Sequence, residues 1–213
     1  MLLAVNITCF AQADLLPEDS PVVASVIHGV KYPLANRFSL QLNVVNYYGD
    51  RLASTWGEGI EPRYNFTEKS WIALPIYTFQ SQAVQGVQFN SGGSTTLVAS
   101  DPSLMIGAAY GYNPLYGKFA IGESITHFRA GFNVGLMAVQ MQDVLGNSSA
   151  SRTQGSFSPA LDAGLQAQVQ FNLNWSAQLF SNAIVQQSDG IQTGNGKDYL
   201  VGWMYGLSLG RAY

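Results

Sequence analysis

Apolar and polar positions alternate along several stretches of this chain. In residues 161–171, and again in residues 199–209, every second side chain is apolar, and the positions between are mostly amides, glycine or small residues. A period of two is typical of a β-strand with one apolar face. The other face lacks the lysine and glutamate of a water-exposed strand. The pattern therefore indicates a strand between lipid and a narrow polar lumen.

The same period, or a strand-like composition, recurs along most of the chain and predicts eight strands. They are expected at residues 37–48, 54–66, 70–82, 104–116, 123–142, 157–171, 175–187 and 198–213. The connections 67–69, 117–122 and 172–174 are short, whereas 83–103, 143–156 and 188–197 are long; only 49–53 breaks this alternation. Short periplasmic turns opposite longer external loops are expected of an outer-membrane barrel, with both termini periplasmic.

Composition supports a membrane-spanning protein. Charged residues form 11% of the chain and apolar residues 47%, whereas a soluble domain usually has about 25% charged residues. No apolar stretch approaches the roughly 18 to 20 residues of a helical span, which leaves a closed barrel. We therefore predict an all-β, closed antiparallel up-and-down transmembrane β-barrel of about eight strands. A soluble lipocalin-like barrel is the rival fold, but eight strands cannot enclose so many large apolar side chains.

The N-terminal residues differ from the rest of the chain. Residues 1–13 end in Ala11-Gln12-Ala13 and are interpreted as the remnant of a secretory signal peptide whose start lies upstream. This segment contains Cys9, the single cysteine, which excludes an internal disulfide. Residues 14–36 are expected to form a periplasmic lead-in, with 22–32 as a possible extra strand or plug, and residues 37–213 the barrel.

Aromatic residues recur near the predicted strand ends, where their rings suit the two membrane interfaces. The predicted interfacial girdle consists of Trp56, Trp71, Trp175, Trp203, Tyr205 and Tyr213. The chain stops on Tyr213 after an alternating apolar set, interrupted by Arg211, that resembles the C-terminal signal read by the barrel-assembly machinery. That machinery and outer-membrane lipids are the expected partners.

Several short segments carry a family resemblance. Lys31-Tyr32-Pro33-Leu34, Tyr64-Asn65-Phe66-Thr67-Glu68 and Tyr116-Gly117-Lys118-Phe119 are similar to segments of the bacterial "outer membrane beta-barrel domain" proteins. The resemblance covers about residue 22 to the C-terminus. It implies a fold like that of the small OmpA-type eight-stranded barrels and an outer-membrane location, and it implies no biochemical activity.

Glu61 and Arg63 share one face of their strand, as do His127 and Arg129, and Asp162 lies opposite Leu161, so these residues are expected to point into the lumen. This predicted lumen cluster consists of Glu61, Arg63, His127, Arg129, Asp162 and Gln166. An eight-stranded barrel is just wide enough to be filled by side chains, so the cluster is interpreted as a paired polar plug. A narrow channel for small solutes stays open as the alternative, and it requires a continuous water path.

Motifs for other chemistry are weak. Gly206-Leu207-Ser208-Leu209-Gly210 matches the nucleophile elbow of α/β-hydrolases, but it lies in a predicted strand with no histidine after it. Small barrels that deacylate lipid A use a His and a Ser two residues apart, and here Arg129 takes that place after His127. We therefore expect no catalytic residues, and a lipid-modifying enzyme is the least favoured function.

Charge and ligand chemistry indicate little else. The net charge of -3 offers no basic patch for nucleic acid. Two histidines and one cysteine argue for no metal site, and no cofactor is expected. The favoured function is that of a small structural or surface-interaction protein of the bacterial outer membrane. The sequence leaves its ligand and oligomeric state open.

Overall fold

The computed structural model describes residues 33–49, 53–83, 97–121, 124–145, 151–189 and 197–213. The chain divides into a unit of residues 1–30 and a unit of residues 31–213. The first unit lies outside the described residues, and with it the predicted signal peptide and most of the lead-in.

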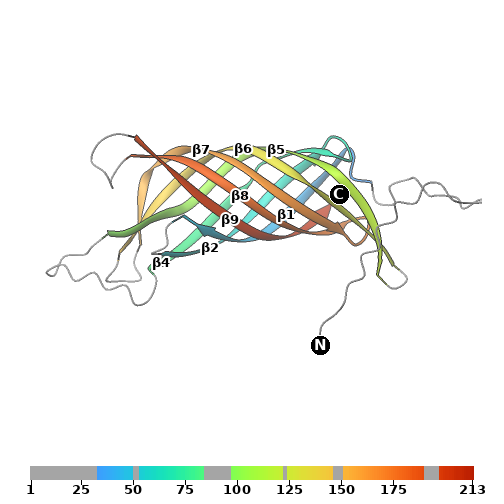
Figure 1. Ribbon diagram of the computed structural model, residues 1–213, viewed down its shortest axis with the longest axis horizontal. Coiled ribbons are helices and arrows are strands. Elements are labelled where there is room, and N and C mark those ends of the chain that lie inside the picture. Colours follow the sequence, from blue (N-terminus) through green and yellow to red (C-terminus); the bar gives the residue numbers. More distant parts are fainter. Residues whose placement is uncertain (1–32, 50–52, 84–96, 122–123, 146–150, 190–196) are drawn as a thin grey trace, which may run out of the picture. The chain divides into compact units, whose positions relative to one another are not determined.

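The described residues form nine antiparallel strands. They are β1 (Arg37–Tyr48), β2 (Ala53–Asn65), β3 (Ser70–Ala73), β4 (Ile76–Ala83), β5 (Leu97–Ile121), β6 (Ser124–Leu145), β7 (Ser151–Gln170), β8 (Trp175–Asp189) and β9 (Lys197–Ala212). Strands that follow one another along the chain pair, except that β3 and β4 both lie between β2 and β5, and β1 also pairs with β9, which closes the sheet into the barrel of Figure 1. The predicted closed antiparallel fold is confirmed.

The predicted strand 70–82 is divided into β3 and β4 at Leu74 and Pro75. Proline has no N–H to donate to the ladder, so regular pairing stops there. The backbone nevertheless stays in line, because Leu74 N donates to Pro62 O (3.0 Å) and Gly107 N donates to Pro75 O (3.0 Å). β3 and β4 thus act as one strand, and the ring has eight strands.

The prediction of a short turn at 117–122 is wrong. Most of this segment belongs to β5, which pairs with β6 as far as Ile121 opposite Ser124. β6 meets β7 only up to His127 opposite Gln170, and β3 meets β5 only up to Ser70 opposite Tyr112. The two strands therefore continue past their other neighbours as a two-stranded ribbon. Phe119 and Phe128 lie together on it, with ring centroids 6.2 Å apart, a pairing that an alternating pattern alone did not reveal.

The two ends of the barrel differ. The turn end contains residues 66–69 and 171–174, the start of β1 and the C-terminus; the loop end lies opposite, where β1, β4, β6 and β8 end. The long connections are shorter than predicted, because β5, β6 and β7 extend toward the loop end at Leu97, Leu145 and Ser151. The connecting residues themselves lie outside the described ranges.

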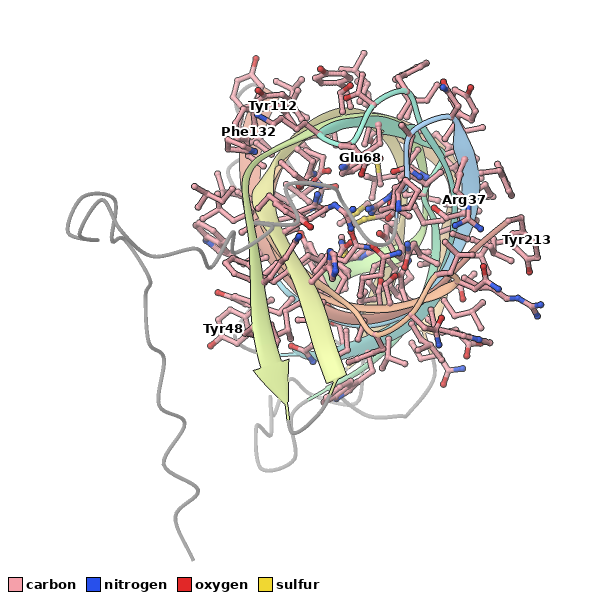
Figure 2. All side chains as sticks on the ribbon, turned by 90° about the vertical axis from the view of Figure 1, so that its right-hand side faces the viewer. Arg37, Tyr48, Glu68, Tyr112, Phe132 and Tyr213 are labelled. Atoms are coloured by element: carbon pink, nitrogen blue, oxygen red, sulfur yellow. The ribbon has the colours of Figure 1, made fainter. Side chains whose placement is uncertain are left out.

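The barrel is apolar outside and mixed inside. Large hydrophobic side chains such as Leu136, Leu161 and Leu165 are 60–68% exposed on the outer wall. Figure 2, which looks along the barrel, shows Tyr48, Phe132 and Tyr213 pointing away from the wall and Glu68 pointing inward. Such an outer face belongs in hydrocarbon, so this is a transmembrane β-barrel. Within the described residues, no helix has the length and apolar character needed to cross a membrane.

Candidate functional site

The structure places all six residues of the predicted lumen cluster in the interior, where each is at most 7% exposed. They do not form one site. Glu61, Arg63, Asp162 and Gln166 line the middle of the lumen around one small cavity. His127 and Arg129 belong to a second group at the turn end, on the strands that form the ribbon.

The centre of the lumen is an ion pair on β2. Arg63 Nη2 lies 2.5 Å from Glu61 Oε1, and Arg63 Nε donates to the same oxygen at 3.1 Å. The two residues are two apart on one strand, so their side chains share the inward face. Arg63 Nη1 also donates to Gln178 Oε1 across the lumen (3.1 Å), and Tyr77 Oη donates to Glu61 Oε2 (3.3 Å). Both charges are thus paired and bonded, as burial requires.

The assignment of Trp71 to the interfacial girdle is wrong. Trp71 is 3% exposed and points inward, where the Arg63 guanidinium carbon lies 3.8 Å from its ring centroid. Ile72 on β3 and Leu74 just after it face outward, and Trp71 and Ala73 take the opposite parity. Gly111, directly across on β5, makes room, because a Cβ there would overlap the indole ring of Trp71. A desolvated cation over an indole face adds to the stability of this centre.

The other five girdle residues are exposed on the outer wall. Trp56, Trp175, Trp203, Tyr205 and Tyr213 are 40–60% exposed. Trp175 and Tyr213 lie at the turn end on either side of Arg211, whose guanidinium carbon is 5.6 and 5.2 Å from their ring centroids. Rings at the two ends of an apolar wall are suited to the two membrane interfaces.

Asp162 is buried, and only one of its two carboxylate oxygens accepts hydrogen bonds. Its Oδ2 accepts from Asn133 Nδ2 and Asn182 Nδ2, both at 3.0 Å. Its Oδ1 has no donor, and neither has Oδ1 of Asn182. These residues line a cavity of about 20 Å³ together with Glu61 and Arg63. A polar cavity of that size holds about one water molecule, which would donate to the two free oxygens. It is too small for an organic solute.

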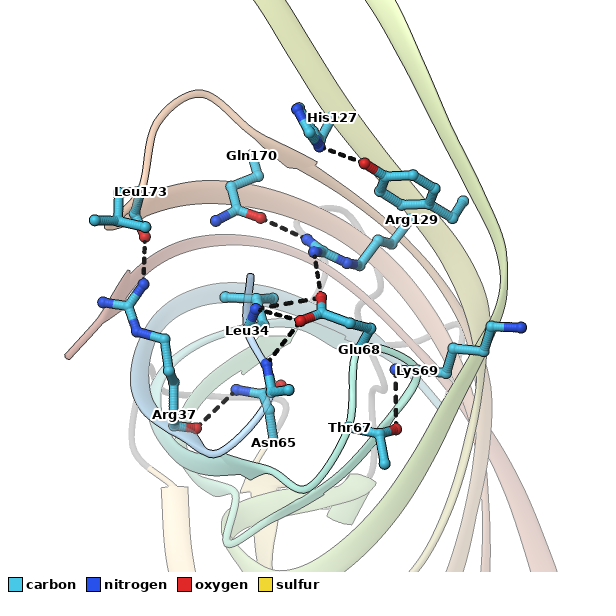
Figure 3. A network of polar contacts seen from close by, with 12 residues as sticks. Leu34, Arg37, Asn65, Thr67, Glu68, Lys69, His127, Arg129, Gln170 and Leu173 are labelled. Atoms are coloured by element: carbon cyan, nitrogen blue, oxygen red, sulfur yellow. Dashed lines mark hydrogen bonds and ion pairs between the residues drawn. The ribbon is translucent and has the colours of Figure 1, made fainter. Parts of the chain in front are cut away.

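The second polar group closes the turn end (Figure 3). Arg129 Nη2 lies 3.1 Å from Glu68 Oε2, and Arg129 Nη1 donates to Gln170 Oε1 (2.5 Å). His127 is fully buried beside this pair, and its Nδ1 shares a hydrogen bond of 2.6 Å with Tyr116 Oη. The histidine thus takes part in a hydrogen-bonded cluster of the mouth.

Glu68 is the residue of this group that the sequence interpretation missed, because it lies in a short turn. Its Oε1 accepts from the backbone N–H groups of Leu34 and Ala35, both at 3.0 Å. Leu34, only 7% exposed, is thereby held in the mouth of the barrel. Strand parity could not have identified it, because a turn residue has no assigned face.

An apolar cluster fills the lumen toward the loop end. Its members come from seven strands: Val45, Tyr47, Tyr77, Phe79, Met105, Met137, Val139, Met141, Ala160, Phe180, Ile184 and Met204. Met105, Val139, Ile184 and Met204 are fully buried. The four methionines of the barrel all belong to it, and their flexible side chains suit the irregular space between aromatic rings. The sequence pattern predicted a polar lumen throughout, so this apolar half is a correction.

Beyond the apolar cluster, polar residues occur again. Thr55 Oγ1 donates to Asp101 Oδ2 (2.7 Å) and accepts from Ser81 Oγ (2.9 Å).

Ser208 of the Gly-x-Ser-x-Gly string lies in β9 and points inward, where its hydroxyl donates to Asn43 Oδ1. The described residues include no group of three or more His, Cys, Asp or Glu placed to hold a metal ion.

No protein-family model matches this chain, and no curated protein sequence does. Solved structures resemble it. The N-terminal β-barrel domain of Pseudomonas aeruginosa OprF matches with 15% identity and a TM-score of 0.45, over 84% of this chain and 98% of that one. Neisserial surface protein A matches with 14% identity and a TM-score of 0.49, over 83% and 97%. Ail, the attachment invasion locus protein of Yersinia pestis, matches with 13% identity and a TM-score of 0.35, over 83% and 97%.

Proposed function

We propose that this protein is a small integral outer-membrane β-barrel with a structural or surface-interaction role, and that its lumen is closed. The observation that carries the proposal is the apolar cluster in the loop half of the lumen. Water and ions cross a constriction lined by hydrocarbon poorly, because it dewets. Together with the paired charges beneath it, this cluster supports a barrel that is a scaffold and not a passage.

The location belongs to the same proposal. An apolar outer wall and aromatic rings near both strand ends support a bacterial outer membrane as its site. We place the turn end in the periplasm, with the C-terminus and the lead-in, and the loop end outside. The connections at the loop end are then the part of the chain available to external partners. The C-terminal strand, with Tyr213 exposed on its outer face, is proposed as the segment that the barrel-assembly machinery reads.

A narrow channel is the second candidate, and the small polar cavity beside Asp162 favours it. Conduction would need this cavity to connect with water at both ends. At the loop end, such a path must pass the rings of Tyr47 and Phe79, whose centroids are 6.1 Å apart. We therefore prefer the closed barrel.

Conductance in a planar lipid bilayer separates the two candidates. We expect the purified wild-type protein to give no stepwise current. Replacing Phe79 and Met105 with serine shortens the apolar cluster and lets water enter it. We therefore expect this variant to conduct. The matched control, Leu161→Ala with Leu165→Ala, removes volume from the outer wall and should stay silent. Stepwise current from the wild type would establish the channel instead.

A further inference from the structure

The outer wall carries a group of polar side chains on β1, β2 and β4, within a largely apolar surface. We term it the wall patch, and it consists of Asn46, Glu58, Thr78 and Gln80. Glu58, Thr78 and Gln80 are exposed and Asn46 is half-buried. Glu58 lies directly opposite Thr78, and Trp56 lies opposite both Asn46 and Gln80, so the four side chains are neighbours on one face.

Glu58 is the unusual member of the wall patch. Among strand carboxylates whose side chains the structure describes, Glu61, Asp101 and Asp162 are buried, and Glu58 faces outward. The next outward side chains on its own strand are Trp56 (59% exposed) and Ile60 (44% exposed). Glu58 therefore lies within the apolar belt and not beyond its edge. An ionisable group in such a position is unfavourable in lipid, and it usually marks a site of function.

The hydrogen bonds inside the wall patch do not involve the Glu58 carboxylate. The Thr78 hydroxyl donates to the backbone carbonyl of Glu58 (3.4 Å), and Asn46 Nδ2 donates to the carbonyl of Thr55 (3.0 Å). Within the described part of the chain, no side chain donates to the Glu58 carboxylate. The described residues thus leave the Glu58 carboxylate available to a partner from outside the barrel.

The wall patch contains the groups that would satisfy its own carboxylate in a second copy. Gln80 offers two amide N–H groups and Asn46 one more, and Glu58 offers acceptors. A surface with both donors and acceptors can pair with itself about a two-fold axis, because each group then meets its counterpart. Hydrocarbon chains of lipids offer no donor at all.

A groove of about 810 Å³ adjoins Glu58 on the outer wall. It is lined mainly by apolar side chains of β1, β2, β4, β8 and β9, such as Val44, Ile60 and Leu207. A facing wall can insert bulky side chains into this hollow while its amides reach the carboxylate. Packing of this kind, combined with hydrogen bonds, is what drives association within a bilayer.

We propose that the wall patch joins two copies of this chain in the membrane. In this two-fold pair, Glu58 of each copy accepts hydrogen bonds from the patch amides of the other, and apolar side chains fill the adjoining grooves. The inference requires that the outer wall meets lipid. It does not depend on whether the lumen conducts.

Site-directed cross-linking in lipid vesicles locates the contact. In a full-length Cys9→Ser background, Ile76→Cys places a thiol in the groove, and Leu161→Cys places one on the outer wall of β7, which lies opposite β2 in the ring. A short bifunctional thiol reagent should yield dimers with Ile76→Cys and few with Leu161→Cys. Equal yields, or a higher yield from Leu161→Cys, would overturn the proposal.

Energy transfer between labelled copies, diluted with lipid, measures the strength of the pair. Glu58→Leu should weaken association by about tenfold or more, the effect of losing a charge-assisted hydrogen bond. This variant removes a charge from the apolar wall, so the barrel itself should fold at least as well. Ser181→Leu, which removes another outward polar side chain on β8, should leave association unchanged. A wild type that stays monomeric, or a Glu58→Leu variant that pairs as well, would refute the proposal.

Discussion

At the scale of single residues, the lumen depends on Arg63. It bonds Glu61 and Gln178 and stacks on Trp71, so one guanidinium holds side chains of β2, β3 and β8 together. Sequence parity was sufficient to predict that Arg63 and Glu61 face inward. It did not identify Gln178, which is 115 residues away along the chain.

Arg63→Met should destabilise the barrel strongly, because it leaves the Glu61 carboxylate buried without its cation. Removing one partner of a buried ion pair usually costs about 3–5 kcal/mol. Equilibrium unfolding in urea, with the protein refolded into phospholipid vesicles, measures this loss.

The double variant Glu61→Gln/Arg63→Met is the matched control. It removes both charges, so its free energy of unfolding should lie closer to the wild-type value than that of Arg63→Met alone. If the single variant is no less stable than the double one, the carboxylate does not depend on Arg63.

At the scale of elements, the turn 67–69 fixes the entry of the chain into the barrel. Glu68 accepts from Leu34 and Ala35, and Asn36 then turns the backbone into β1 with a φ of 58°. Asparagine tolerates this left-handed conformation better than most residues. Asn36 N donates to Asn65 O at 2.7 Å, so the entry segment is bonded to the end of β2.

Glu68→Ala should release this entry segment and leave the barrel folded. The amides of Leu34 and Ala35 lose their acceptor, and Arg129 loses its carboxylate partner. Hydrogen exchange followed by NMR in micelles should show faster exchange at both amides.

Lys69→Ala is the control for the turn, since Lys69 is exposed and adjacent. It should leave the exchange of both amides as in the wild type. Protection that survives Glu68→Ala would mean that other contacts hold the entry segment.

At the scale of the whole molecule, the barrel has apolar residues outside and charged residues inside, the reverse of a soluble domain. The outer wall is apolar, while paired charges and amides fill the turn half of the lumen and an apolar cluster fills the loop half. At the turn end, Arg37 at the start of β1 donates to Tyr213 O just after β9 (3.2 Å) and to Leu173 O in the turn 172–174 (2.8 Å). These hydrogen bonds hold the ends of β1 and β9 together.

Leu165→Arg tests which solvent the outer wall meets. Leu165 lies in the middle of β7 and is 68% exposed. If it faces the bilayer midplane, the substitution should cost about 2–4 kcal/mol in vesicle-based equilibrium unfolding. In water, a substitution at so exposed a position would be nearly neutral.

Leu173→Arg is the matched substitution in the turn 172–174, where the side chain is 47% exposed. It should cost much less, because an arginine near the interface reaches water. Equal costs at the two positions would argue against a lipid-facing wall.

The sequence by itself determined the strands and their faces. The predicted bounds of β1 match the structure, and inward and outward residues follow from parity, because side chains of a strand alternate between two solvents. Pro75 and the β5–β6 ribbon departed from the prediction, since pairing with neighbours decides where a strand stops.

Only the tertiary structure decided which inward side chains meet. Closing the ring sets how far each strand is staggered against the next, and this stagger brings Arg63 to Gln178 and Glu68 to Leu34. It also left Trp71 inside, in the space that Gly111 leaves open across the sheet. Such contacts depend on the register of the whole barrel, and a local pattern of alternation does not contain it.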